Sequence, residues 1–300
     1  MELPDDYRKF SQFRLTGYNV IMIKNILTRI HFRGKGRLVS LFRGLFLPKE
    51  HITQIANFPS ATSFSLNHIW DSESTLMFFG CPESIREDLL FIKKQKLGLG
   101  NIIDVGANIG MYSIYFAKEI PIHGKVYAFE PAQELFFRLS KNVDINNLGN
   151  SLQIESLAIN NTAEPTLLSL PRDLHKSSGS GSLIPSPDYI KVTVPSTTLD
   201  AYCSQHKIGK VSLIKIDVEG AELQVLEGFS AILKRDKPSI FFEVNGSNFA
   251  EGFKGAEKIF GALLGSIGYK LYFQNHLETI PVSRAIEQGL ITDGNWWAEA

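Results

Sequence analysis

Short apolar runs alternate with amphipathic stretches over the C-terminal two thirds of the chain. Apolar runs predict five strands, at residues 102–105, 126–129, 152–158, 211–216 and 239–244. Apolar residues spaced three and four apart predict four helices, at about residues 111–118, 132–146, 221–234 and 253–267. Strands that are apolar almost throughout are typical of a parallel sheet covered on both faces. The pattern therefore predicts an α/β fold with a Rossmann-like, open, mostly parallel sheet flanked by helices.

Several further segments extend this pattern at both ends of the sheet region. Residues 61–80 mix β-like runs with turn residues and predict a hairpin, and Pro82-Glu83 opens a helix that continues to about Lys96. Residues 271–273 and 296–297 predict additional edge strands.

A stretch rich in Ser, Gly and Pro interrupts the alternation at residues 175–187. It separates two β-like runs, 166–170 and 190–194, and predicts a loop within an inserted hairpin. Its composition fits a lid over a site and an ordinary surface loop equally well.

The charge balance excludes a strongly basic protein but conceals an uneven distribution. The 300 residues carry 31 Lys+Arg and 31 Asp+Glu, so we expect no nucleic-acid partner, and a 44% hydrophobic content argues against disorder. Ten basic and four acidic residues give residues 1–50 a charge of +6, which leaves −6 for the rest. The basic charge is therefore concentrated in an N-terminal extension.

Two amphipathic helical stripes lie in that extension, at residues 18–30 and 38–46. A basic amphipathic helix can make peripheral contact with an anionic membrane or bind an acidic partner. It can also pack its apolar stripe on the following domain, and this is the interpretation that we favour.

The chain is too poor in cysteine for a disulfide framework, with only Cys81 and Cys203, and no apolar run reaches the length of a membrane span. The start of the sequence lacks the compact apolar stretch of a signal peptide, so we expect a cytoplasmic protein.

The strongest chemical signal is the sequence IIDVGANIG at residues 102–110, where a strand leads through a glycine-rich turn into a helix. Gly106 and Gly110 allow a ligand to approach the backbone at a helix N-terminus. Glu130 ends the next strand, where an acid can accept both hydroxyls of a ribose. The Gly-x-Gly-x-x-Gly spacing of dinucleotide-binding folds is absent, and a carboxylate at Asp104 suits a ligand with a cationic end, such as S-adenosylmethionine.

A second signal is the sequence LIKIDVEGAELQVLEG at residues 213–228. Lys215 and Asp217 share one face of a strand, and a lysine inside an apolar strand must find a partner. Asp217 and Glu219 lie at the strand's carboxyl end, where open α/β sheets bind their ligands. Glu222 falls in the first turn of the next helix, and we interpret it as structural. Glu243, which ends the following strand, adds another polar group to this rim.

These motifs together resemble the FkbM family of S-adenosylmethionine-dependent methyltransferases. The resemblance rests on DVGANIG, the FEP after the next strand, TTLD at residues 197–200 and IKIDVEGAE at residues 214–222, and it covers about residues 64–300. It implies a class I methyltransferase domain at 64–300, preceded by a basic, partly helical extension at 1–63. The implied reaction is O-methylation of a hydroxyl on a sugar, glycan or other natural product, so the expected partner is a small-molecule or glycan acceptor.

Site residues follow from the resemblance motif by motif. The cofactor loop would consist of Asp104, Gly106, Ala107, Asn108 and Gly110, with Glu130 on the ribose and Ala158 beside the adenine. Asp217 is our first candidate for the catalytic base or for orienting the acceptor, Glu219 is the second, and Lys215 would tune the pair. Asp217 and Glu219 could also hold a divalent ion, but we expect no metal.

Two other classes of function compete with a methyltransferase. A nicotinamide-dependent oxidoreductase can use a similar sheet, although Asp104 and the absent dinucleotide spacing count against it. A catalytically silent module could bind the cofactor and act through residues 1–50. The sequence does not specify the methyl acceptor or the oligomeric state.

Overall fold

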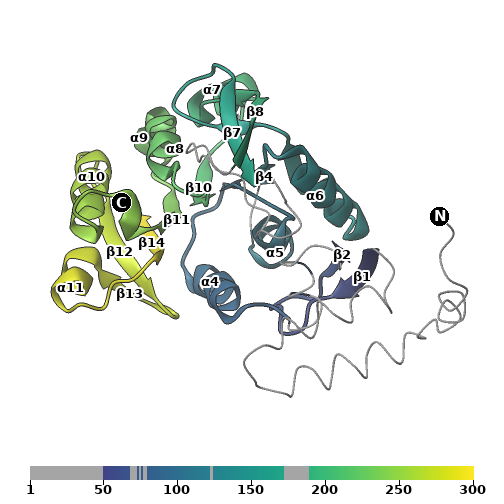
Figure 1. Cartoon of the computed structure of the whole chain (residues 1–300), viewed down its shortest axis with the longest axis horizontal. Helices are drawn as coiled ribbons and strands as arrows, with labels where there is room; N and C mark the ends of the chain where they lie inside the picture. Colours follow the sequence, from purple (N-terminus) through teal and green to yellow (C-terminus); the bar gives the residue numbers. More distant parts are fainter. Residues whose placement is uncertain (1–49, 68–72, 74–75, 77–79, 122–123, 172–188) are drawn as a thin grey trace, which may run out of the picture.

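The structure is a computed structural model that describes residues 50–67, 73, 76, 80–121, 124–171 and 189–300 (Figure 1). Its centre is an eight-stranded sheet with the order β13-β12-β14-β11-β10-β3-β4-β5. The five strands from β11 to β5 run parallel, which confirms the predicted open, mostly parallel sheet. Their bounds are β3 Asn101–Val105, β4 Val126–Phe129, β5 Leu152–Glu155, β10 Val211–Ile216 and β11 Ser239–Val244.

Helices cover both faces of this sheet, so successive strand residues enter two separate apolar clusters. In β10, Leu213 packs into one cluster, while Ile214 and Ile216 pack into the other. The first cluster holds the buried faces of α4 (Glu83–Lys94), α5 (Met111–Glu119) and α6 (Gln133–Ile145). The second holds those of α7 (Leu199–Gln205), α8 (Glu222–Glu227), α9 (Ser230–Asp236), α10 (Phe253–Gly265) and α11 (Val282–Glu287). All six residues of β10 are buried, as expected for a strand between two helical layers.

Two predicted elements are divided in the structure. The strand predicted at 152–158 ends at Glu155, and β6 (Ala158–Ile159) pairs instead with β9 (Ser196–Thr197) in a separate two-stranded sheet. The helix predicted at 221–234 breaks into α8 and α9 around Gly228. A Cβ at Gly228 would lie 2.2 Å from the carbonyl oxygen of Asn160, so the break lets the chain pass close to the backbone that follows β6.

The last strands occupy different places from those predicted. The strand at residues 296–297 is β14 (Gly294–Glu299), which lies between β11 and β12 (Lys270–Asn275) and is antiparallel to both. Neither β14 nor β12 is an edge strand, because β13 (Glu278–Pro281) forms the edge. Trp296 and Trp297 point to opposite faces and enter the two different apolar clusters, which is the property of an interior strand.

Strand β2 (Ser63–Asn67) pairs with the upstream strand β1 (Glu50–Gln54), so residues 61–80 do not supply both strands of the predicted hairpin, at least among those described. Strand β1 lies in the predicted extension at 1–63, and β2 lies almost wholly in the predicted domain at 64–300, so this pairing connects the two.

The inserted hairpin is confirmed as β7 (Thr166–Pro171) and β8 (Tyr189–Val194). The stripes at 18–30 and 38–46 and the whole Ser/Gly/Pro stretch at 175–187 lie outside the described residues. Within the described part of the chain, the helices are too short or too polar to cross a membrane.

Candidate active site

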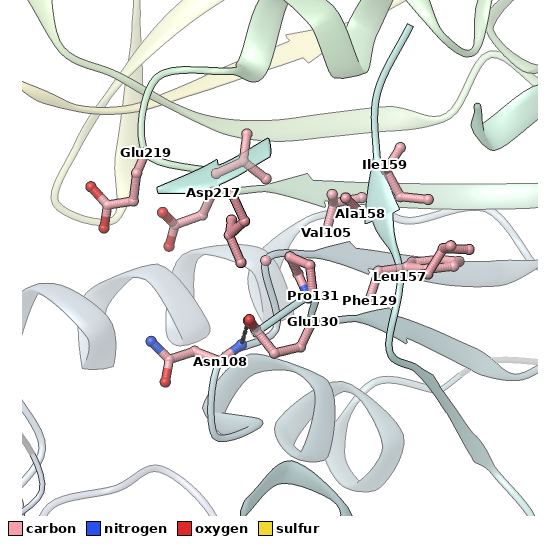
Figure 2. A pocket seen from close by; sticks show the side chains of 13 residues that line it. Val105, Asn108, Phe129, Glu130, Pro131, Leu157, Ala158, Ile159, Asp217 and Glu219 are labelled. Carbon is pink, nitrogen blue, oxygen red and sulfur yellow. Dashed lines mark hydrogen bonds between the residues drawn. The ribbon is translucent and has the colours of Figure 1, made fainter. Parts of the chain in front are cut away.

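A pocket opens at the carboxyl ends of the parallel strands, where β3, β4 and β10 meet β6 (Figure 2). One end is acidic and contains Asp217 and Glu219, while the other is apolar and contains Leu157, Ala158 and Ile159. The lining residues are Val105, Gly106, Asn108, Phe129, Glu130, Pro131, Leu157, Ala158, Ile159, Leu168, Asp217, Val218 and Glu219. The pocket thus joins a carboxylate-bearing end to an apolar slot.

Gly106 lines this pocket in a conformation that only glycine adopts without strain. Its φ is +80°, and a Cβ there would lie 1.8 Å from the carbonyl oxygen of Asp217. The backbones after β3 and β10 therefore approach each other more closely than any side chain would permit. This close approach brings the glycine-rich loop and the acidic end of the pocket together.

Glu130 lies directly after β4, and its carboxylate is hydrogen-bonded to the glycine-rich loop that follows β3. Its Oε2 accepts a hydrogen bond from the Asn108 backbone N–H at 2.8 Å, and its Oε1 accepts one from the Ala132 N–H at 2.9 Å. Burial raises the pKa of this carboxyl to about 7, despite these two backbone hydrogen bonds. A carboxylate has roughly four acceptor positions, so two remain for hydroxyl groups of a ligand.

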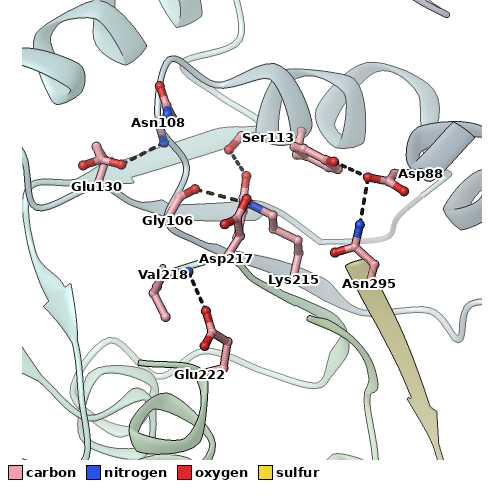
Figure 3. Close-up of polar contacts among 12 residues, drawn as sticks. Asp88, Gly106, Asn108, Ser113, Glu130, Lys215, Asp217, Val218, Glu222 and Asn295 are labelled. Carbon is pink, nitrogen blue, oxygen red and sulfur yellow. Dashed lines mark hydrogen bonds and ion pairs between the residues drawn. The ribbon is translucent and has the colours of Figure 1, made fainter. Parts of the chain in front are cut away.

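Lys215 lies outside the pocket lining (Figure 3), and its ammonium forms a buried ion pair with Asp104. Asp104 is fully buried, and it accepts a hydrogen bond from the Ser113 hydroxyl. The Lys215 Nζ lies 3.4 Å from Asp104 Oδ1 and 3.3 Å from Asp217 Oδ2, and it donates to the Gly106 carbonyl oxygen at 3.2 Å. Burial alone would lower the pKa of Lys215, but the two carboxylates raise it above its ordinary value. The expectation that this lysine must find a partner is confirmed.

The turn after β10 presents two carboxylates to the pocket. The Asp217 side chain is 39% exposed, and Glu219 adopts a φ of +55°. Glu222 stabilises this turn, because its Oε1 accepts hydrogen bonds from the backbone N–H groups of Val218 at 3.2 Å and Gly220 at 3.0 Å. The structural interpretation of Glu222 is therefore confirmed.

The structure divides the predicted site residues into two groups. Six line the pocket: Gly106, Asn108, Glu130, Ala158, Asp217 and Glu219. The other four lie outside its lining and support it: Asp104, Ala107, Gly110 and Lys215. Asp104 in particular pairs with Lys215, whereas the sequence led us to expect that it faces the ligand. In the described part of the chain, no group of three or more His, Cys, Asp or Glu side chains is arranged to hold a metal ion.

Sequence reasoning missed a buried carboxylate, Asp88, that is connected to this ion pair through Tyr112. Asp88 of α4 accepts hydrogen bonds from the Tyr112 hydroxyl and from the side-chain amide of Asn295, which Figure 3 shows beside it. The Tyr112 ring lies against the Lys215 ammonium. A signal was available, since Asp88 falls between Ile85 and Ile92 on the apolar face of its predicted helix. Glu243 also has a more unusual environment than expected: burial, together with the carboxylates of Asp217 and Glu219, raises its pKa to about 8.

The sheet and the pocket at the carboxyl ends of its parallel strands form a Rossmann-like domain of the kind found in class I methyltransferases. The sequence profile of the methyltransferase FkbM domain matches residues 104–271, which is more than half of the chain. The chain therefore belongs to the FkbM methyltransferase family.

Individual relatives match a smaller part of the chain. Methyltransferase sdnD of Sordaria araneosa is 29% identical over 157 residues, covering 42% of this chain and 59% of its own. Hexuronic acid methyltransferase AglP of Haloferax volcanii is 29% identical over 141 residues, covering 44% of this chain and 50% of its own. The chain thus spans between half and three fifths of these relatives. The solved structure of methyltransferase FkbM from Methylobacillus flagellatus is 13% identical, with a TM-score of 0.42 over 67% of this chain and 43% of its own.

Proposed function

We propose that this protein transfers a methyl group from S-adenosylmethionine to a hydroxyl oxygen of a sugar or other natural product. Membership of the FkbM family supports the reaction class. The relative named a hexuronic acid methyltransferase supports a sugar acceptor. The observation that carries the proposal is the position of Glu130, whose buried carboxylate lines the same pocket as the backbone of Gly106. No described feature favours a nicotinamide-dependent oxidoreductase.

The residues around the pocket fit the parts of S-adenosylmethionine in order. Glu130 would accept the ribose hydroxyls, using the acceptor positions that Asn108 and Ala132 leave free. The apolar slot around Ala158 would hold the adenine. The backbone at Gly106, which no side chain screens, would lie against the methionine end. Asp104 would act through Lys215 rather than by direct contact, because the pair lies behind the loop.

Asp217 would act at the reacting end of the pocket. When bound, S-adenosylmethionine supplies a methyl group on a sulfonium sulfur, which leaves as a neutral thioether. Asp217 would accept the proton of the acceptor hydroxyl as the oxygen of that hydroxyl takes up the methyl group. Lys215 holds Asp217 through an ion pair at 3.3 Å, and Glu219, which also lines the pocket, would orient the acceptor. Positioning of the two reactants supplies much of the rate in such a displacement.

The affinity for S-adenosylhomocysteine should depend on the ionisation of Glu130. The ionised carboxylate is the stronger acceptor for ribose hydroxyls, and the pKa of this group is raised to about 7. Affinity should therefore increase with pH up to about 7, by at most about tenfold per pH unit, and then level off. Titration calorimetry between pH 5.5 and 8.5 measures this dependence. The Glu130→Gln variant should bind weakly and show little of this pH dependence, and an unchanged profile would remove Glu130 from the ribose site.

Loss of the proposed base should stop transfer without stopping cofactor binding. Asp217→Asn should reduce methyl transfer by about 100-fold or more, since a positioned base contributes roughly 10²–10⁴-fold. The assay follows transfer of radiolabelled methyl from S-adenosylmethionine into glycan, lipid and small-molecule extracts. Asp144→Asn, which changes an exposed aspartate on α6, is the matched control and should label as the wild type does. Labelling by Asp217→Asn at the wild-type rate would exclude Asp217 as the base, while a wild type that labels nothing would contradict the methyltransferase.

A further inference from the structure

Asp88 lies outside the segment that matches the family profile, yet it is connected through Tyr112 to the buried Lys215. It is 6% exposed and belongs to α4, which precedes the first strand of the matched segment. The Tyr112 hydroxyl of α5 donates to Asp88 Oδ2 at 2.6 Å, and the Asn295 side-chain amide of β14 donates to the same oxygen at 3.0 Å. The Gln274 side chain of β12 is a further hydrogen-bond partner, so four elements meet at this carboxylate. Figure 3 shows the contact with Asn295.

A carboxylate at this position is costly for the fold. Its neighbours in α4, Leu89 and Phe91, are almost completely buried, and burial raises the pKa of Asp88 to about 6 despite its hydrogen bonds. A buried charge is retained at the expense of stability, so an apolar residue at this position would suit packing alone better. Packing alone therefore does not account for an acid at position 88.

Tyr112 connects this carboxylate with Lys215. The Lys215 ammonium has three N–H donors, and it has three oxygen partners, on Gly106, Asp104 and Asp217. The Tyr112 ring covers a further side of the ammonium, with its centroid 4.6 Å from Nζ. Burial and the neighbouring Asp88 carboxylate raise the pKa of the Tyr112 hydroxyl well above its ordinary value, so this hydroxyl remains a hydrogen-bond donor.

We propose that Asp88, Tyr112 and Asn295 form a positioning unit that fixes the Lys215 ammonium and, through it, two parts of the pocket. Lys215 contacts the Gly106 carbonyl oxygen on the cofactor loop and the Asp217 carboxylate at the reacting end. A ring held at one angle favours one position of the ammonium, and donation to a carboxylate makes the ring a better partner for a cation. This inference rests on the proposed function in one respect. Changes in Asp88 or Tyr112 can alter cofactor affinity only if the pocket is the cofactor site.

Tyr112→Phe is the sharpest test, because it retains the ring and removes only the hydrogen bond to Asp88. Its matched control is Tyr269→Phe, which removes the buried hydrogen bond, 2.8 Å long, from Tyr269 to the Pro238 carbonyl oxygen, a pair outside the pocket lining. Asp88→Asn tests the same unit from its other end. Two quantities are measured for each variant: the dissociation constant of S-adenosylhomocysteine, and the NMR signal of the Lys215 ammonium in lysine-labelled protein, assigned by its loss in Lys215→Arg.

The positioning unit predicts a specific pair of results. Tyr112→Phe and Asp88→Asn should weaken S-adenosylhomocysteine binding by about threefold to tenfold and should shift or broaden the Lys215 ammonium signal. Tyr269→Phe should lower the melting temperature and change neither quantity. A purely structural role would instead give Tyr112→Phe the behaviour of Tyr269→Phe, with both quantities unchanged, and would overturn the proposal. If the wild type does not bind S-adenosylhomocysteine, the proposed function fails, and the ammonium signal alone decides whether Asp88 and Tyr112 fix Lys215.

Discussion

Gly106→Ala is expected to abolish S-adenosylhomocysteine binding and to destabilise the protein strongly. The added Cβ would lie 1.8 Å from the Asp217 carbonyl oxygen, so one of two backbone segments must move. The φ of +80° adds conformational strain for any residue with a Cβ. Together, overpacking and strain should lower the free energy of unfolding by about 3–5 kcal/mol. Denaturant unfolding and titration calorimetry measure the two effects.

Gly261→Ala is the matched control for this change. Gly261 lies inside α10, and a Cβ there would meet no atom within 4 Å. The control should retain binding and gain up to about 1 kcal/mol of stability, because alanine favours the helix more than glycine does. If Gly106→Ala binds S-adenosylhomocysteine as tightly as the control, the close approach of the two backbones is not part of the cofactor site.

Lys215→Met should have the second largest effect. The lysine is 3% exposed, and its removal leaves the fully buried carboxylate of Asp104 without its ion-pair partner. Breaking a buried pair in this way costs about 3–5 kcal/mol, because an uncompensated charge remains in the core. Denaturant unfolding at neutral pH measures this loss, and cofactor binding should fall with it.

A double variant separates the buried charge from the loss of packing. Asp104→Asn in the Lys215→Met background removes the uncompensated charge, and the Ser113 hydroxyl can still donate to the new amide oxygen. The double variant should therefore recover a large part of the lost stability without recovering cofactor binding. A Lys215→Met protein as stable as the wild type would contradict the ion pair.

Features governed by local pattern and chain direction were predictable from the sequence. Nearly continuous apolar runs predicted β3, β4, β10 and β11 within one residue at each end, because each strand is buried on both faces. The carboxyl ends of parallel strands meet at one edge, so the sequence also predicted that Glu130 and Asp217 lie near the same ligand. Lys215 was predicted to pair because a lone buried ammonium is too costly.

Contacts between distant segments were not predictable in this way. Strand β14 lies inside the sheet because β11 and β12 pair with it on either side and helices cover Trp296 and Trp297. The local sequence of β14 does not indicate these neighbours. The Asp88 carboxylate meets Asn295 across 207 positions of sequence, and only the fold brings them together. Asp104 was expected to face the ligand, but the partner that it meets in the fold, Lys215, lies behind the loop.

The central claim is that this pocket binds S-adenosylmethionine with Glu130 on the ribose. Titration calorimetry of the wild type with S-adenosylhomocysteine, and separately with NAD⁺ and NADH, tests it most directly. We expect one molecule of S-adenosylhomocysteine to bind per chain, no heat from either nicotinamide nucleotide, and at least about tenfold weaker binding in Glu130→Gln. Binding of a nicotinamide nucleotide with none of S-adenosylhomocysteine would contradict the account.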